Sequence, residues 1–263
     1  MQGYCINSLG ADGYAVGSGD RNGVVHSADY REPFWRIDGT EVNRVLAYWR
    51  AGGYHIDPRG FDGYAPGLEN DQSKTDSQPQ PAACQETMPT YSCGSILCIT
   101  NTFEYSGKLL SLLLRPKLPQ GWTIQSVSGY GNPELVAGEV VCTGILPSNS
   151  VRVVYTLSVP PGNRTPKQVG CEIEYQLSGM VNPAVINCDS LNLATVKIVS
   201  AEKQENMVKF NLLGESNGLY RIEYSTDLKN WNPLSNLRAV NGQVNFSDSP
   251  SSRYKFYRAV LLE

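Results

Sequence analysis

A fifteen-residue motif occurs twice near the N-terminus, at a constant offset of fifty positions. Residues 3–17 read GYCINSLGADGYAVG, residues 53–67 read GYHIDPRGFDGYAPG, and nine of the fifteen positions are identical. Self-similarity this dense, in a segment rich in Gly and Tyr, is typical of repeat units that pack on their neighbours. The repeat therefore favours a structural subunit of a larger array over an enzyme.

One helix is expected between the two copies, over residues 40–50. Asp38 and Glu41 have the spacing of a capping box, and the glycines at 52–53 supply a stop signal. An apolar stripe with helical spacing runs along this segment and consists of Val42, Val45, Leu46 and Trp49. The helix is therefore expected to bury this stripe.

The second motif follows the helix directly, whereas no helix precedes the first motif in the sequence. Ile56 and Tyr64 of the second copy are expected to cover the stripe, so Ile6 and Tyr14 of the first copy need the other side of the helix or a neighbouring molecule. A contact between unlike patches propagates head to tail, whereas two motifs flanking one helix would form a self-contained unit. The expected assembly interface comprises Tyr4, Ile6, Asp12, Tyr14, Val42, Val45, Leu46 and Trp49.

The remainder of the chain is predicted to be mainly β. Residues 68–83 are polar, carry two prolines and are expected to form an extended linker. Residues 84–193 contain six alternating or β-branched runs separated by Pro- and Gly-containing turns, which indicates a β-sandwich. In the last run, 170–177, one face carries Cys171, Ile173, Tyr175 and Leu177 and the other carries Glu172, Glu174 and Gln176, as in a sheet with one side buried. Residues 194–263 repeat this signature on a smaller scale and are expected to form a compact meander or a second sandwich.

The seven cysteines have no metal-type spacing and favour disulfides in an oxidising compartment. Six are expected to form disulfides. Cys5 is expected to be the unpaired cysteine, because the second motif has His55 at the equivalent position. The pairing set is Cys84, Cys93, Cys98, Cys142, Cys171 and Cys188, with Cys84–Cys93 as the local pairing expected where the linker enters the sandwich. Buried free thiols in a cytosolic protein are the alternative.

Charge and hydropathy exclude several partners. The net charge is −3 and only 18% of residues are charged, so there is no basic field for nucleic acid. The most apolar run, residues 109–114, is too short to span a membrane. Residues 1–4 do not have the pattern of a signal peptide, so an extracellular location requires that residue 1 follows a removed leader.

Chemistry-bearing residues are sparse. His26 and His55 are the only histidines, and neither belongs to a recognisable catalytic or metal motif, so no enzyme activity is expected. Asn163 and Asn245 match the N-glycosylation sequon. Aromatic residues beside turns could stack on sugar rings, although covering their own core is the favoured interpretation for Tyr91, Tyr105, Tyr130 and Trp231.

Residues 26–67, HSADYREPFWRIDGTEVNRVLAYWRAGGYHIDPRGFDGYAPG, resemble the degenerate dockerin-like or EF-hand-like repeats of large exported proteins. That family has a loop of oxygen ligands running into a helix with a Glu near its start. Asp29 could open such a loop, but Arg31 and Pro33 replace ligands, and Glu41 lies one residue late. The resemblance implies a helix-turn unit that has lost its ion, so no cofactor is expected and calcium at Asp29 and Glu41 is disfavoured.

Residues 114–162 are similar to the immunoglobulin-like repeat domains of bacterial surface proteins, with their Leu-Pro-x-Gly-Trp turn and Tyr-Thr-x-x-Val-Pro strand end. The stretches GLYRIEYSTDLKNWNPL and SSRYKFYRAVLLE resemble a small C-terminal β module of exported proteins. Together these resemblances imply a modular exported bacterial surface protein. The implied organisation is a dockerin-like helical repeat unit (1–67), a linker (68–83), an immunoglobulin-like β-sandwich (84–193) and a small C-terminal β domain (194–263).

The sequence as a whole favours a non-enzymatic extracellular structural protein that assembles with copies of itself into a head-to-tail surface filament or pilus-like fibre. An adhesin or carbohydrate-binding accessory module, with glycans as partners, is the main alternative. A calcium-dependent anchor to a scaffold is a third possibility. Neither nucleic acid nor a membrane span is expected.

Overall fold

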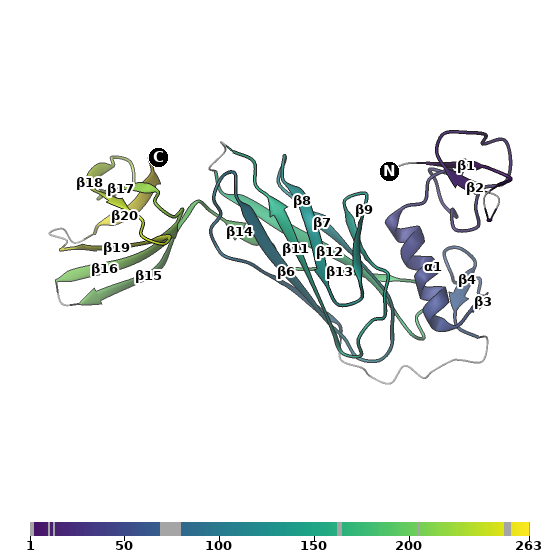
Figure 1. The fold of residues 1–263 in the computed structure, drawn as a ribbon. Coiled ribbons are helices and arrows are strands. Elements are labelled where there is room, and N and C mark those ends of the chain that lie inside the picture. The colour runs from purple at the N-terminus through teal and green to yellow at the C-terminus, as the bar shows by residue number, and fades with distance from the viewer. Residues whose placement is uncertain are drawn as a thin grey trace.

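The computed structural model describes residues 3–9, 11–12, 14–68, 80–161, 165–204, 206–249 and 254–262. Three parts follow one another along an elongated molecule, with the N-terminal hairpins and helix at one end and a small β module at the other (Figure 1). Most of the expected linker, 68–83, and the sequon residue Asn163 lie outside the described residues.

Both copies of the repeated motif fold as short antiparallel hairpins. The first consists of β1 (Tyr4–Ile6) and β2 (Tyr14–Val16), and the second of β3 (Tyr54–Ile56) and β4 (Tyr64–Pro66). The sequence does not predict these hairpins, because three-residue strands are too short to show an alternating pattern.

The helix α1 (Gly39–Ala51) begins and ends where the capping signals predict. The Asp38 carboxylate accepts a hydrogen bond from the Glu41 amide at 3.0 Å, and the Glu41 carboxylate accepts one from the Asp38 amide at 2.8 Å. Gly52 ends the helix at φ 81°, a left-handed conformation that glycine adopts without a Cβ clash.

Two antiparallel sheets form the central sandwich, which confirms the prediction of an immunoglobulin-like β-sandwich. One sheet has the strand order β13 (Ala184–Asn187), β12 (Lys167–Leu177), β7 (Leu109–Lys117), β10 (Glu139–Cys142) and β9 (Pro133–Val136), with β14 (Leu191–Leu193) also paired to β12. The other has the order β5 (Ala82–Glu86), β6 (Ile96–Glu104), β11 (Ser150–Ser158) and β8 (Thr123–Gly129). Alternate side chains of both sheets fill the core between them, including Phe103, Leu112, Val153, Ile173 and Tyr175.

The C-terminal module packs two three-stranded sheets around a small core of its own. These are β15 (Val196–Gln204), β16 (Met207–Gly214) and β19 (Gln243–Asp248), and β18 (Asn232–Arg238), β17 (Leu219–Ser225) and β20 (Phe256–Leu261). Its core contains Phe210, Leu212, Tyr220, Ile222 and Val244. The predicted second small β domain is therefore confirmed as a two-sheet sandwich.

Helix α1 lies on the outer face of the first sheet of the sandwich, over β7 and β10 (Figure 1). The alternation of β12 places Cys171, Ile173 and Tyr175 in the core, as predicted. Glu174 and Gln176 on its other face are also buried, although the sequence pattern predicted a solvated face. The N-terminal part is thus packed against the sandwich and does not stand apart from it.

Candidate binding surface at the N-terminal end

Arg44 is the centre of the contact between α1, the second hairpin and the sandwich. Its side chain is fully buried and donates to both carboxylate oxygens of Asp62, at 3.0 Å from Nε and 2.9 Å from Nη2. Nη1 donates to Oε1 of Gln176 at 3.0 Å and to the carbonyl of Val181 at 2.9 Å, and Nη2 also reaches the carbonyl of Tyr64 at 2.7 Å. One guanidinium therefore joins three parts of the fold.

Burial alone would raise the pKa of Asp62, but the hydrogen bonds from Arg44 and from the Tyr48 hydroxyl outweigh it and lower the pKa. A planar guanidinium that meets a carboxylate through two parallel bonds is the strongest ordinary form of ion pair. Because the pair is buried, loss of either partner leaves an uncompensated charge, at a cost of about 3–5 kcal/mol. The Arg44–Asp62 pair therefore fixes the position of the second hairpin relative to α1.

A second polar cluster holds the N-terminal half of α1 to the sandwich. The Glu174 carboxylate accepts from Nδ2 of Asn43 at 3.1 Å and from Nη2 of Arg115 at 2.8 Å. Arg115 also pairs with Glu139 at 2.8 Å and Glu172 at 3.2 Å. Glu172 and Glu174, which the sequence pattern assigned to a solvated sheet face, thus accept the hydrogen bonds of this cluster.

Arg50 fastens the other end of the helix. Its guanidinium donates to three backbone carbonyls of the sandwich, those of Leu110 at 2.8 Å, Cys142 at 2.6 Å and Gly144 at 2.7 Å. Burial lowers the pKa of Arg50. Arg44 near the middle of α1 and Arg50 in its last turn therefore make polar contacts with the sandwich where an apolar contact was expected.

The prediction that α1 buries its apolar stripe is wrong. The buried positions are Gly39, Thr40, Glu41, Asn43, Arg44 and Ala47. Val45 and Trp49 of the stripe are 42% and 66% exposed, and Val42 and Leu46 are half-buried. The reason is that the sandwich offers α1 a polar face built from Glu174 and Gln176, which pairs with the polar side of the helix.

Ile56 and Tyr64, which were expected to cover the stripe, are themselves exposed. Ile56 is 77% exposed, and Tyr64 is 40% exposed. The result is an exposed apolar surface at this end of the molecule, which we call the Trp49 patch; it consists of Val45, Trp49, Tyr54, Tyr64 and Ile145.

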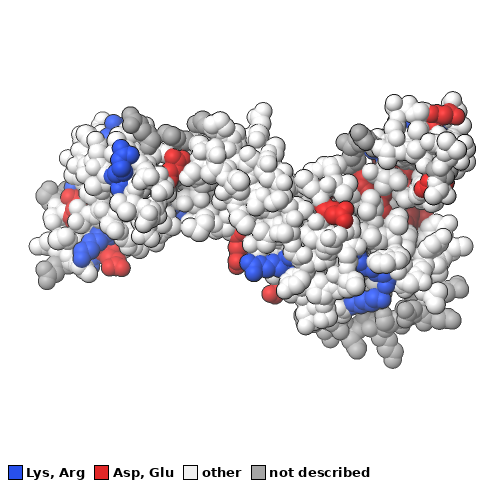
Figure 2. Space-filling model, in the orientation of Figure 1, with Lys and Arg blue, Asp and Glu red and all other residues white. Residues whose placement is uncertain are grey.

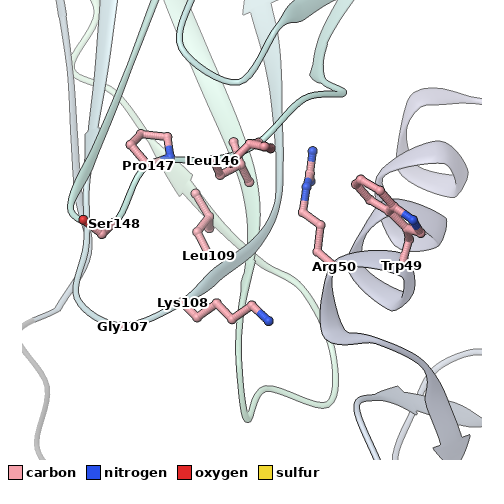
Figure 3. Close-up of a pocket in the computed structure, with 9 residues that line it drawn as sticks. Trp49, Arg50, Gly107, Lys108, Leu109, Leu146, Pro147 and Ser148 are labelled. Carbon is pink, nitrogen blue, oxygen red and sulfur yellow. The ribbon is translucent and has the colours of Figure 1, made fainter.

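Two hollows flank Trp49. One, of about 790 Å³, lies toward the hairpins and is lined by rings that include Tyr30, Tyr48, Tyr54 and Tyr64. The other, of about 440 Å³, lies toward the sandwich. Figure 3 shows Arg50 extending into this second hollow from the helix, with Leu109, Leu146 and Pro147 on the opposite side. Trp49 therefore projects as a ridge between two concave apolar surfaces.

The first motif uses its matching residues differently. Tyr4 is buried, and its hydroxyl donates to Oδ2 of Asp29 at 2.5 Å. The Tyr14 hydroxyl donates to the carbonyl of Val24 at 2.9 Å, and Ile6 is half-buried. Asp12 occupies the motif position of Asp62, but its side chain is 59% exposed and lies 3.4 Å from His26. Of the first-motif residues expected at an assembly interface, Asp12 is therefore the exposed one.

Asp29 and Glu41, the candidate calcium ligands, hold their loop through hydrogen bonds. Oδ2 of Asp29 accepts from the Trp35 amide at 2.5 Å, and Oε1 of Glu41 accepts from the Tyr30 and Arg31 amides at 3.0 and 3.3 Å. N–H donors thus occupy carboxylate oxygens that an ion would need. No cluster of three or more His, Cys, Asp or Glu side chains suited to a metal occurs among the described residues.

None of the seven cysteines, which all lie in the described part of the chain, forms a disulfide, contrary to the expectation of three. Cys84 and Cys93 cannot pair, because Cys84 lies opposite Thr102 and β6 begins only at Ile96. The six residues of strand from Thr102 back to Ile96 place the start of β6 about 20 Å from the level of Cys84, and Cys93 lies before that start. A disulfide requires Cα atoms within about 7 Å.

The remaining sequence candidates separate by exposure. Asn245 is exposed on β19, in register with Asn211 of β16, so the second sequon is accessible. Tyr91 and Tyr105 are buried, as the core interpretation predicted, whereas Tyr130 is 61% exposed. Trp231 is half-buried and its ring lies 4.3 Å from the guanidinium carbon of Arg258.

Sequence reasoning missed Arg44, Asp62 and Arg50 as the residues that position this surface. One signal was present, since Asp12 and Asp62 are identical positions of the repeated motif. A carboxylate kept in both copies points to a cationic partner, and Arg44 is a cation on the adjacent helix. Nothing in the spacing of Arg50 or Ile145 indicated their place at the Trp49 patch.

No protein-family model matches the chain, and no curated protein matches it. Among solved structures, the full-length major pilin SpaD from Corynebacterium diphtheriae is similar with a TM-score of 0.37 at 7% identity, over 65% of this chain and 50% of that one. The fimbrial adhesin FimA from Actinomyces has a TM-score of 0.29 at 11% identity, over 62% and 77%. A non-cellulosomal cohesin from the archaeon Archaeoglobus fulgidus has a TM-score of 0.30 at 14% identity, over 43% and 91%.

The chain therefore spans about half the length of the full-length pilin that it matches. Likeness at these identities and TM-scores does not assign a function to this chain. Among the described residues, no helix is long and apolar enough to cross a membrane.

Proposed function

We propose that this chain is a non-enzymatic structural subunit of an extracellular or cell-surface fibre, and that it associates head to tail through the Trp49 patch. The observation that carries the proposal is the orientation of α1, which buries its polar face and leaves Val45 and Trp49 exposed. A contiguous exposed apolar surface is typical of a protein–protein contact. The patch lies at one end of the elongated molecule, where an end-to-end contact would form (Figure 1).

The occupant that we assign to the patch is the C-terminal module of a second copy. That module lies at the opposite end of the molecule (Figure 1) and exposes apolar side chains of its own, namely Ile198, Val199, Leu228 and Val240. Contact between two different patches does not close on itself unless the rotation permits, and so it propagates into a filament. Contact between the C-terminal module of one copy and the Trp49 patch of the next therefore gives an open chain. Contact between two Trp49 patches would instead give a closed dimer.

Charge favours the same pairing. Residues 1–67 carry eight Asp and Glu against six Arg, a net charge of −2, whereas residues 194–263 carry nine Lys and Arg against seven Asp and Glu, a net charge of +2. On the face drawn in Figure 2, acidic side chains lie over the N-terminal hairpins, whereas the C-terminal module shows both basic and acidic side chains. Opposite charge suits contact between unlike ends and disfavours contact between like ends.

Sedimentation velocity over a range of protein concentrations tests this function. The wild-type chain is expected to form larger species as concentration rises, and Trp49→Gln to remain monomeric at the same concentrations. Tyr130→Gln is the matched control, because Tyr130 is an aromatic side chain of similar exposure on the sandwich, and it is expected to behave as wild type. A wild-type chain that stays monomeric at every concentration would contradict the proposal.

A carbohydrate-binding or adhesin role is the second candidate, and the hollow of about 790 Å³ supports it. Tyr54 is 59% exposed at this hollow, and tyrosine rings can stack on sugar faces. Tyr54→Ala is expected to abolish binding on a glycan array if this role is correct. Absence of glycan binding by the wild-type monomer would exclude it and leave the fibre role unaffected.

A further inference from the structure

Cys171 of β12 lies directly opposite Cys188, the residue that follows β13. In the antiparallel pairing of β12 with β13, Glu172 lies opposite Asn187, so the next opposed pair is Cys171 and Cys188. The Cys188 amide donates to the Cys171 carbonyl at 2.9 Å, which confirms this register. Opposed residues of an antiparallel pair have Cα atoms about 4.5–5.5 Å apart, and this separation falls within the range that a disulfide spans.

Both side chains are also buried in the same core cluster of the sandwich. The Cys171 thiol lies 3.7 Å from the Glu172 carbonyl. Interaction between the two thiols raises the pKa of Cys171 and lowers that of Cys188. Strand register and burial therefore place the two thiols on the same side of the sheet, within the sandwich core.

The other five cysteines have different neighbours; Cys142 belongs to the same core cluster but lies opposite Pro133 of β9. The Cys142 thiol lies 3.9 Å from the Tyr130 carbonyl, and burial raises its pKa to about 12. Cys84 and Cys98 are exposed on β5 and β6, four residues apart in strand register, since Cys84 lies opposite Thr102. Cys93 lies before β6, and Cys5 lies in the first hairpin, where its thiol contacts the Ala15 carbonyl at 3.5 Å.

We propose that Cys171 and Cys188 form a disulfide when the chain folds in the presence of a small-molecule disulfide such as oxidised glutathione. The two thiols are oxidised to one S–S bond, the glutathione disulfide is reduced, and its two sulfurs leave as thiols that carry the two protons. The bond would close the segment 171–188 and tie the edge strand β13 to β12. The remaining five cysteines stay reduced, which replaces the three disulfides expected from the sequence with one.

Peptide mapping under non-reducing conditions tests the pairing directly. The protein is refolded with oxidised and reduced glutathione, alkylated in denaturant, and digested. The expected result is one linked peptide pair containing Cys171 and Cys188, with alkylation of all five other cysteines. Full alkylation of Cys171 and Cys188 would overturn the proposal, as would their linkage to other cysteines.

Thermal unfolding with and without dithiothreitol separates the bond from simple packing of the two thiols. The oxidised wild type is expected to lose roughly 10 °C of melting temperature on reduction. The double variant Cys171→Ala/Cys188→Ala is expected to show no response to dithiothreitol, whatever its own melting temperature. The control Cys84→Ser/Cys98→Ser removes two exposed thiols and should respond to dithiothreitol as the wild type does. An oxidised wild type that does not respond would contradict the proposal.

Discussion

Asp12 and Asp62 occupy the same position of a repeated motif and have opposite surroundings. Asp62 is 5% exposed and paired with Arg44, whereas Asp12 is 59% exposed and lies beside His26. Sequence identity between the copies predicts that both adopt the same local fold, and it does not reveal which copy meets a helix. That difference arises from the sandwich, which adds Gln176 and the Val181 carbonyl to the surroundings of Arg44.

The two aspartates supply a matched test of the buried ion pair. Asp62→Ala leaves Arg44 buried without its partner and is expected to weaken the docking of α1 by about 3 kcal/mol. Asp12→Ala removes an exposed carboxylate and is expected to cost at most about 0.5 kcal/mol. Denaturant-dependent hydrogen exchange of the α1 amides measures both. Equal losses of docking free energy in the two variants would show that the Arg44–Asp62 ion pair does not stabilise the docking of α1.

The same pair predicts a dependence on pH. The pKa of Asp62 is lower in the folded chain than its unfolded value of about 3.9. Its contribution to stability is therefore present above that unfolded value and is lost as the pH falls through the folded pKa. Protection of the α1 amides is expected to decline below about pH 4 in the wild type. Asp62→Asn should remove this contribution, and an unchanged acid profile in that variant would contradict the assignment.

At the scale of elements, the sequence predicted the long segments well. The alternation in 170–177 and the capping box at Asp38 and Glu41 gave strand β12 and helix α1 close to their observed bounds. Local signals of this kind are set within a few residues of chain, so the sequence contains them in full. It missed β9 and β13, which have only four residues and little alternation, and it also missed the seven-residue β18.

The buried face of α1 could not be predicted in the same way. The apolar stripe containing Val45 and Trp49 is the larger hydrophobic surface of the helix, and pattern alone assigns it to the interior. The structure buries the opposite side because Glu174 of the sandwich accepts a hydrogen bond from Asn43 and Gln176 accepts one from Arg44. Choosing the correct face requires the tertiary partner, which lies more than a hundred residues away in the sequence.

The docked helix also predicts how the chain behaves after cleavage. The polar sequence of residues 68–83 predicts that limited proteolysis first cuts within 70–80. Because Arg44 and Arg50 bond α1 to the sandwich, the two fragments are expected to stay together in size-exclusion chromatography and to separate in urea. Release of the N-terminal fragment in native buffer, or a first cut near Asn192, would contradict this organisation.

At the scale of the whole molecule, the two ends differ in kind. The N-terminal end is acidic and carries the Trp49 patch, and the C-terminal module is basic and carries exposed aliphatic side chains such as Ile198 and Val240. The sequence predicts an assembly contact formed by the first motif and the apolar stripe of α1. The structure leaves Val45 and Trp49 in an accessible position, whereas Tyr4 is buried within its own loop.

Electron microscopy of the purified chain at high concentration tests the central claim most directly. We expect unbranched fibres in which single molecules follow one another end to end, absent in Trp49→Gln and present in Tyr130→Gln. Closed dimers, or monodisperse single molecules of the wild-type chain under these conditions, would contradict head-to-tail assembly through the Trp49 patch.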